Sequence, residues 1–172
     1  MGMIANYHCI EDSDLKEILR LESEDDEEEV FEAVRDLNEN TDAFLDIDKM
    51  WDVIHFILTG VSTDKPPKNN PLSEAVIGVH PLKDLSEFVA YVDKERVAAI
   101  VSALDNFDYE SVLEDFDAAE CKDAGLYPNI WDEDDEDEID ELLEEIADYL
   151  EDFRDFYKKV LESGGNALIT IY

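Results

Sequence analysis

Residues 46–60, DIDKMWDVIHFILTG, constrain the fold more than any other segment of the chain. Apolar side chains recur there at helical spacing, which predicts one helix with a broad face packed into a core. The members of that face are Ile47, Met50, Trp51, Ile54, Ile57 and Leu58. We expect Asp46 to cap the start of this helix and Gly60 to end it. The segment therefore predicts one element of a globular core.

A polar seam runs between the apolar flanks of this predicted helix. Its members are Asp48, Asp52, His55 and Thr59, spaced i, i+4, i+7 and i+11. Because each residue turns the helix by about 100°, these side chains fall within a narrow arc. Asp52 and His55 are i, i+3 neighbours, and a carboxylate beside an imidazole raises its proton affinity, as in many general bases. They are the catalytic candidates. The ligand-binding candidates are Asp48, Trp51, Asp52, His55, Thr59 and His80.

A structural role explains the same residues. Asp48 would lie in the first helical turn, where the helix dipole favours a carboxylate, and His55 would hydrogen-bond a neighbouring loop. His80 follows a short predicted helix that ends at Gly78, which would return it toward the seam, but a lone histidine is more often structural. No HExxH, CxxC or GxSxG motif occurs, and residues 132–138 lack the central glycine of a calcium loop. We therefore predict neither a metal site nor a cofactor.

Segments of strand composition lie at both ends of the chain. Residues 3–10 and 166–172 have this composition, and residues 88–92 (FVAYV) add a third candidate strand. The remainder has mainly helical periodicity, longest over residues 138–162. Because strands and helices do not alternate regularly, we predict a helix-rich α+β fold with a small sheet that includes the N- and C-terminal strands. A length of 172 residues favours a single domain over residues 1–172.

The chain has a formal net charge of −35, from 48 acidic and 13 basic residues. Two runs, residues 22–29 and 132–138, are strongly acidic, and we expect both to be mobile surface segments. So negative a surface repels nucleic acid and anionic membranes, and it favours a basic protein as partner. Adaptation to high salt is an alternative explanation of the same acidity.

The sequence also carries expectations about location. Its first ten residues, MGMIANYHCI, lack the basic start and long apolar run of a signal peptide. No stretch approaches the roughly 18 apolar residues that a membrane-spanning helix needs. Cys9 and Cys121 are the only cysteines, and reduced thiols are the default for such a pair. We therefore expect a cytoplasmic protein.

Several segments together resemble the YfbM-like family, bacterial proteins of unknown function. They are the opening MGMI, the segment DIDKMWDVIHFILTG, the segment KNNPLSEAVIG, the pair Tyr127-Pro128 and the terminal NALITIY. The matches keep their order along nearly the whole chain. The resemblance implies a cytoplasmic bacterial protein with one α+β domain, and it implies no particular activity.

Two functional hypotheses follow. The leading one is a non-enzymatic acidic binding module, similar to an inhibitor or an immunity protein, that engages a basic partner through charge. It depends on the net charge and on the lack of a complete catalytic motif. The alternative is a small enzyme or small-molecule-binding protein with a cleft along the 46–60 helix, where polar residues stand between large apolar ones.

Overall fold

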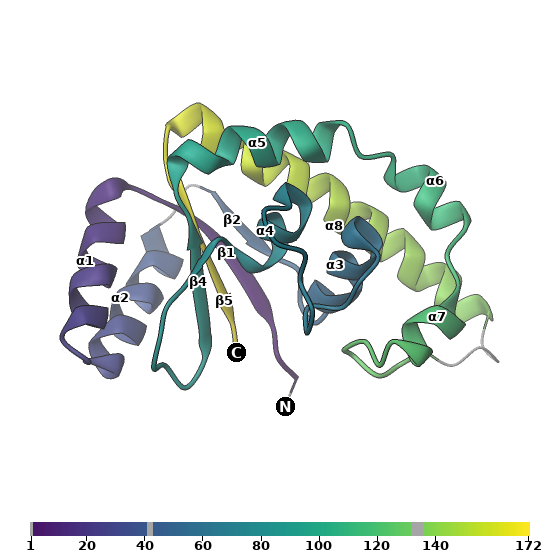
Figure 1. Ribbon diagram of the computed structural model, residues 1–172, viewed down its shortest axis with the longest axis horizontal. Coiled ribbons are helices and arrows are strands. Elements are labelled where there is room, and N and C mark those ends of the chain that lie inside the picture. The colour runs from purple at the N-terminus through teal and green to yellow at the C-terminus, as the bar shows by residue number, and fades with distance from the viewer. Residues whose placement is uncertain (1, 41–42, 132–135) are drawn as a thin grey trace.

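A computed structural model describes residues 2–40, 43–131 and 136–172, and it contains eight helices and one five-stranded sheet within those ranges (Figure 1). The strands, in spatial order, are β2 (Phe44–Asp46), β1 (Ala5–Ile10), β5 (Asn166–Ile171), β4 (Phe88–Val92) and β3 (His80–Pro81). Each neighbouring pair is antiparallel. The two terminal strands lie side by side, with Ala5 opposite Ile171. The predicted α+β class and the shared terminal strands are therefore confirmed.

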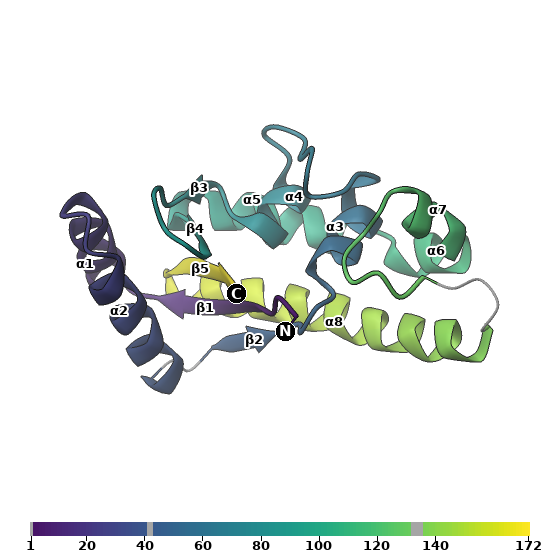
Figure 2. The ribbon, with the colours of Figure 1, turned by 90° about the horizontal axis from the view of Figure 1, so that it is seen from below.

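Helices cover both faces of the sheet. They are α1 (Asp12–Ser23), α2 (Glu27–Asn40), α3 (Trp51–Thr59), α4 (Pro71–Ile77), α5 (Lys94–Asp105), α6 (Tyr109–Glu114), α7 (Ala118–Asp123) and α8 (Glu136–Ser163). The α1–α2 hairpin packs on one face, and α3, α4, α5 and α8 pack on the other (Figure 1). Helix α8 extends past the sheet, and α6 packs beside its projecting half (Figure 2). The central strands are thus buried on both sides.

Alternation along β1 divides the interior into two cores. Tyr7 belongs to the larger core, and its hydroxyl donates to the carbonyl of Val76 at 2.7 Å. Ile10 belongs to the smaller core under the α1–α2 hairpin, together with Leu168 of β5. Side chains two residues apart on a strand share a face, so His8 also points toward the hairpin.

The predicted helix over residues 46–60 begins later than its periodicity suggested. Asp46 ends strand β2 opposite Asn6, and its carboxylate accepts a hydrogen bond from the backbone N–H of Asp48 at 2.7 Å. Asp48 has a φ of 47°, in the left-handed region, and α3 starts only at Trp51. The prediction of Asp46 as the helix cap is therefore wrong. The reason is that Asp46 pairs with Asn6 of β1 and so belongs to a strand, which the helical spacing of its neighbours does not reveal. The apolar face is buried as predicted, and Gly60 ends the helix with a φ of 78°.

The acidic run at residues 22–29 lies in the α1–α2 hairpin, at the end of one helix and the start of the next. The carboxylate of Glu22 accepts from the backbone N–H of Lys83 at 2.8 Å, and that of Glu27 accepts from the N–H of Ser86 at 2.7 Å. Two of these acids thus hold the loop between β3 and β4. In the second run, residues 132–135 lie outside the described residues. The mobility of both runs stays a prediction.

Short elements were missed by the sequence analysis: β2, β3 and α7. Each is too short for a periodic pattern to stand out. Among the described residues, no helix combines the length and apolarity required to cross a membrane.

Candidate functional site

Three of the four seam residues lie on α3, and Asp48 lies in the turn before it. Asp52 is 4% exposed. Its Oδ1 accepts from the backbone N–H and the hydroxyl of Thr63, both at 2.9 Å. Its Oδ2 accepts from the backbone N–H of Tyr127 at 3.0 Å. Asp52 therefore joins α3 to the loop after Gly60 and to the turn at Tyr127.

His55 is fully buried, and both ring nitrogens have partners. Nδ1 lies 2.8 Å from the carbonyl oxygen of Val61, which only accepts, so Nδ1 carries the proton. Nε2 then accepts from the hydroxyl of Ser73 at 2.7 Å. Burial lowers the pKa of His55, and this outweighs the opposing effects of the Val61 hydrogen bond and the Asp52 charge. The expected rise in proton affinity is wrong, because desolvation of the imidazolium dominates.

The remaining ligand-binding candidates have similarly local partners. The hydroxyl of Thr59 donates to the carbonyl of His55 at 2.7 Å. His80 is exposed at the edge of the sheet, where its Nε2 lies 2.9 Å from a carboxylate oxygen of Asp93. Its ring lies 4.8 Å from that of Tyr91, so the contacts of His80 are with β4 and the cap of α5 rather than with the seam. A catalytic or ligand-binding role for the seam stays a prediction.

Four of the five segments that carry the family resemblance meet around α3. The indole N–H of Trp51 donates to the carbonyl of Met3 at 3.2 Å, and its ring stacks on that of Tyr127. The backbone N–H of Met3 donates in turn to the hydroxyl of Tyr127 at 2.6 Å. Asn70 caps α4, accepting from the N–H of Leu72 at 2.9 Å. Met3, Trp51 and Tyr127 thus form one network that holds the N-terminus and the Tyr127 loop against α3, whereas the Asn70 hydrogen bond is local to the start of α4.

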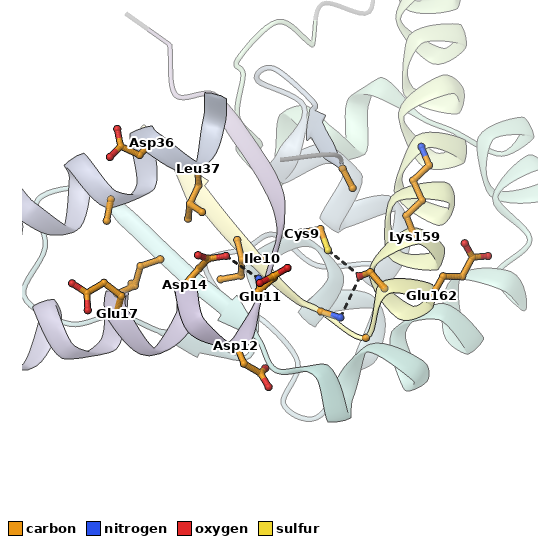
Figure 3. Close-up of a pocket in the computed structure, with 16 residues that line it drawn as sticks. Cys9, Ile10, Glu11, Asp12, Asp14, Glu17, Asp36, Leu37, Lys159 and Glu162 are labelled. Atoms are coloured by element: carbon orange, nitrogen blue, oxygen red, sulfur yellow. Dashed lines mark hydrogen bonds between the residues drawn. The ribbon is translucent and has the colours of Figure 1, made fainter. Parts of the chain in front are cut away.

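A wide cavity lies between the α1–α2 hairpin and the C-terminal end of α8, with a volume of about 1060 Å³ (Figure 3). We call it the acidic groove. Its charged lining consists of Glu11, Asp12, Asp14, Glu17, Asp36, Glu162 and Lys159. The lining thus holds six carboxylates and one ammonium group, and two of the carboxylates, Asp12 and Glu17, are paired with Lys94 and Arg20. Lys159 and Glu162 lie on α8, across the cavity from Glu17 and Asp36 on the hairpin (Figure 3).

Hydrogen bonds fix the positions of several of these carboxylates. Asp14 accepts from the backbone N–H of Glu11 at 3.0 Å. Hydrogen bonding from Lys94 lowers the pKa of Asp12, and hydrogen bonding from Arg20 lowers the pKa of Glu17. Asp12 and Glu17 therefore stay ionised at neutral pH, each in an ion pair with the cation that lowers its pKa. The groove has no local signature in the sequence, because its acids come from three separate elements, and only the overall acidity hints at it.

The floor of the groove is partly apolar, with Ile10, Ile18 and Leu37 among its lining residues. The thiol of Cys9 lies 3.3 Å from the hydroxyl of Ser163. Within the described part of the chain, no group of three or more His, Cys, Asp or Glu side chains is placed to hold a metal ion.

The fold and the groove define a small α+β domain with a carboxylate-lined cavity beside its sheet. A family model described as a domain of unknown function, DUF1877, matches residues 1–170, and the chain belongs to this family. It is 30% identical to Protein YfbM of Escherichia coli (strain K12) over 172 residues, which span 99% of each chain. It also matches the crystal structure of YfbM from Escherichia coli, a protein of unknown function, with a TM-score of 0.78 and 28% identity. That match covers 98% of this chain and 99% of the other. The resemblance inferred from the sequence is confirmed.

Proposed function

We propose that this chain is a non-enzymatic binding protein whose acidic groove receives cationic side chains of a basic protein partner, in the manner of an inhibitor or an immunity protein. The observation that carries the proposal is the groove lining, which contains one ammonium group and six carboxylates, two of them paired with Lys94 and Arg20. The net charge of −35 extends the same field over the molecule and would speed association with a basic surface. We place this binding in the cytoplasm, where the free thiols of Cys9 and Cys121 would stay reduced.

The groove suits the two-part chemistry of lysine and arginine side chains. Their aliphatic stems cover apolar surface while the charged end stays near polar groups. Here the half-buried Leu37 supplies apolar surface, and Glu17 and Glu162 supply carboxylates around it.

The proposal predicts salt-sensitive binding of a lysine-rich peptide, measured by titration calorimetry. Raising NaCl from about 20 mM to about 300 mM shortens the Debye length from roughly 20 Å to roughly 6 Å, and we expect affinity to fall about tenfold or more. Affinity that does not change with salt would contradict an electrostatic mode of binding.

A matched pair of variants locates the binding. We expect Glu17→Gln combined with Glu162→Gln to weaken peptide binding by about tenfold, because both carboxylates line the groove. The control combines Glu110→Gln with Glu141→Gln, which removes the same charge from exposed positions outside the groove. Equal losses in the two double variants would show that net charge, and not the groove, attracts the peptide.

A further inference from the structure

A second, smaller cavity lies between α2 and the sheet, on the face that the α1–α2 hairpin covers. Its volume is about 200 Å³, smaller than a site for a drug-sized ligand. Its walls include Phe31 and Val34 of α2 and Val89 of β4, and Thr170 of β5 lines it from the sheet. Figure 1 shows α2 alongside β4 and β5. We call it the hairpin cavity.

Thr170 is a buried polar group without a partner. It is 2% exposed, and within the described part of the chain its hydroxyl oxygen makes no hydrogen bond. Its side chain shares a face of β5 with Leu168, which packs under the hairpin, so Thr170 lies on the side of the sheet that bears the cavity. Asn6, opposite Thr170 on β1, donates instead to the hydroxyl of Tyr172 at 3.2 Å. Buried hydroxyls are usually hydrogen-bonded, and a ligand atom in the cavity would supply the missing partner.

Two opposite charges stand at the rim of the same cavity. Arg35 and Glu87 both line it, and both are exposed. Arg20, Arg96 and Arg154 each lie within 4 Å of a carboxylate oxygen. Arg35 has no such ion pair among the described residues, although the chain contains 48 acidic residues. Its guanidinium is therefore available to a carboxylate from outside.

We propose that the hairpin cavity binds a free α-amino acid whose side chain ends in a hydrogen-bonding group. The ligand carboxylate would pair with the guanidinium of Arg35, which suits carboxylates geometrically, and the ligand ammonium would pair with Glu87. The ligand side chain would enter between Phe31 and Val89 and reach the hydroxyl of Thr170. This inference is independent of the acidic groove, which lies elsewhere on the hairpin and favours cations alone.

The test is calorimetric titration of the full chain with L-threonine and L-glutamine. L-valine and L-leucine are the controls, because they are of similar size and lack a hydrogen-bonding tip. We expect the polar-tipped ligands to bind about fivefold or more tightly than their apolar counterparts, as one net hydrogen bond provides. The methyl ester of L-threonine, which lacks the carboxylate charge, should bind about tenfold more weakly than L-threonine.

Two variants distinguish the contribution of Thr170 to amino-acid binding from that of Arg35 at the rim. Thr170→Val keeps the shape of the side chain and should abolish the preference for polar-tipped ligands. Arg35→Gln should weaken the binding of all four amino acids about tenfold. Arg20→Gln, on α1 and outside the cavity, should leave their binding unchanged. Circular dichroism checks that each variant is folded. The proposal is overturned if none of the four amino acids binds at about 10 mM, or if Thr170→Val and Arg35→Gln bind as the unaltered chain does.

Discussion

Asp52→Ala lowers the free energy of unfolding by about 3–4 kcal/mol in urea denaturation. The buried carboxylate accepts hydrogen bonds from two groups of Thr63 and from the backbone of Tyr127. Alanine leaves all three donors without an acceptor, and hydrogen bonds to a charged group are among the stronger ones in proteins. The loop after Gly60 is then no longer held against α3.

The matched control is Asp64→Ala, which removes an exposed carboxylate from the same loop. Its effect should stay within about 0.5 kcal/mol, as is usual for surface positions. If the two variants are equally stable, Asp52 is not the structural anchor that its contacts indicate. A functional role for Asp52 in the seam would then become the better explanation.

Acidification from about pH 8 to about pH 5 lowers the free energy of unfolding by about 2 kcal/mol through His8 alone. His8 is fully buried on β1, and among the described residues neither ring nitrogen has a hydrogen-bond partner. Burial lowers its pKa to about 4, because the charged imidazolium would lose its hydration.

The direction follows from proton binding in the two states. In the unfolded chain His8 takes up a proton as the pH falls through about 6.5, whereas in the folded protein it stays neutral until about pH 4. Between these values the unfolded state binds more protons, so acid favours unfolding. The contribution of His8 to the free energy of unfolding is fully present above about pH 6.5 and is lost progressively as the pH falls toward 4. His55, whose pKa is also lowered by burial, acts in the same direction.

The carboxylates of the chain titrate over part of this range, so the contribution of His8 is measured as a difference from His8→Leu. Leucine matches the apolar surroundings, since the position lies opposite Leu168 and beside the ring of Phe44. At about pH 8 the variant should be at least as stable as the unaltered chain, because two unpaired polar atoms are gone. Its stability should then fall less steeply with acid. Stability curves that run parallel from about pH 8 to about pH 5 would refute the prediction.

Local features of the fold were predictable from the sequence. Asn70, Asp93 and Asp108 cap their helices, and their side-chain oxygens are of the kind that favours this position. Gly60 ends α3, because a left-handed residue is least costly as glycine. The terminal strands were recognised from β-branched and aromatic composition. Each of these signals depends on neighbours in the chain, so no knowledge of the tertiary structure was needed.

The candidate site was less predictable. Helical spacing placed Asp52 and His55 on one helix, and α3 bears them both. Their partners come from Thr63, Tyr127 and Ser73, which helical periodicity does not connect to them. The acid–base pair suggested by the i, i+3 spacing is replaced by separate hydrogen bonds to two loops and to α4. The acidic groove likewise forms only when α8 returns beside the α1–α2 hairpin.

The sequence by itself determined the α+β class, the main helices, the family and the acidity, because periodicity, capping and charge are properties of the chain. Tertiary structure decided where the polar groups went. It buried His55 and lowered its pKa, bound Asp52 to two loops, left Thr170 without a partner and gathered six carboxylates around one groove. The physical reason is that hydrogen bonding, desolvation and charge clustering depend on distances in space, which the order of residues along the chain does not specify.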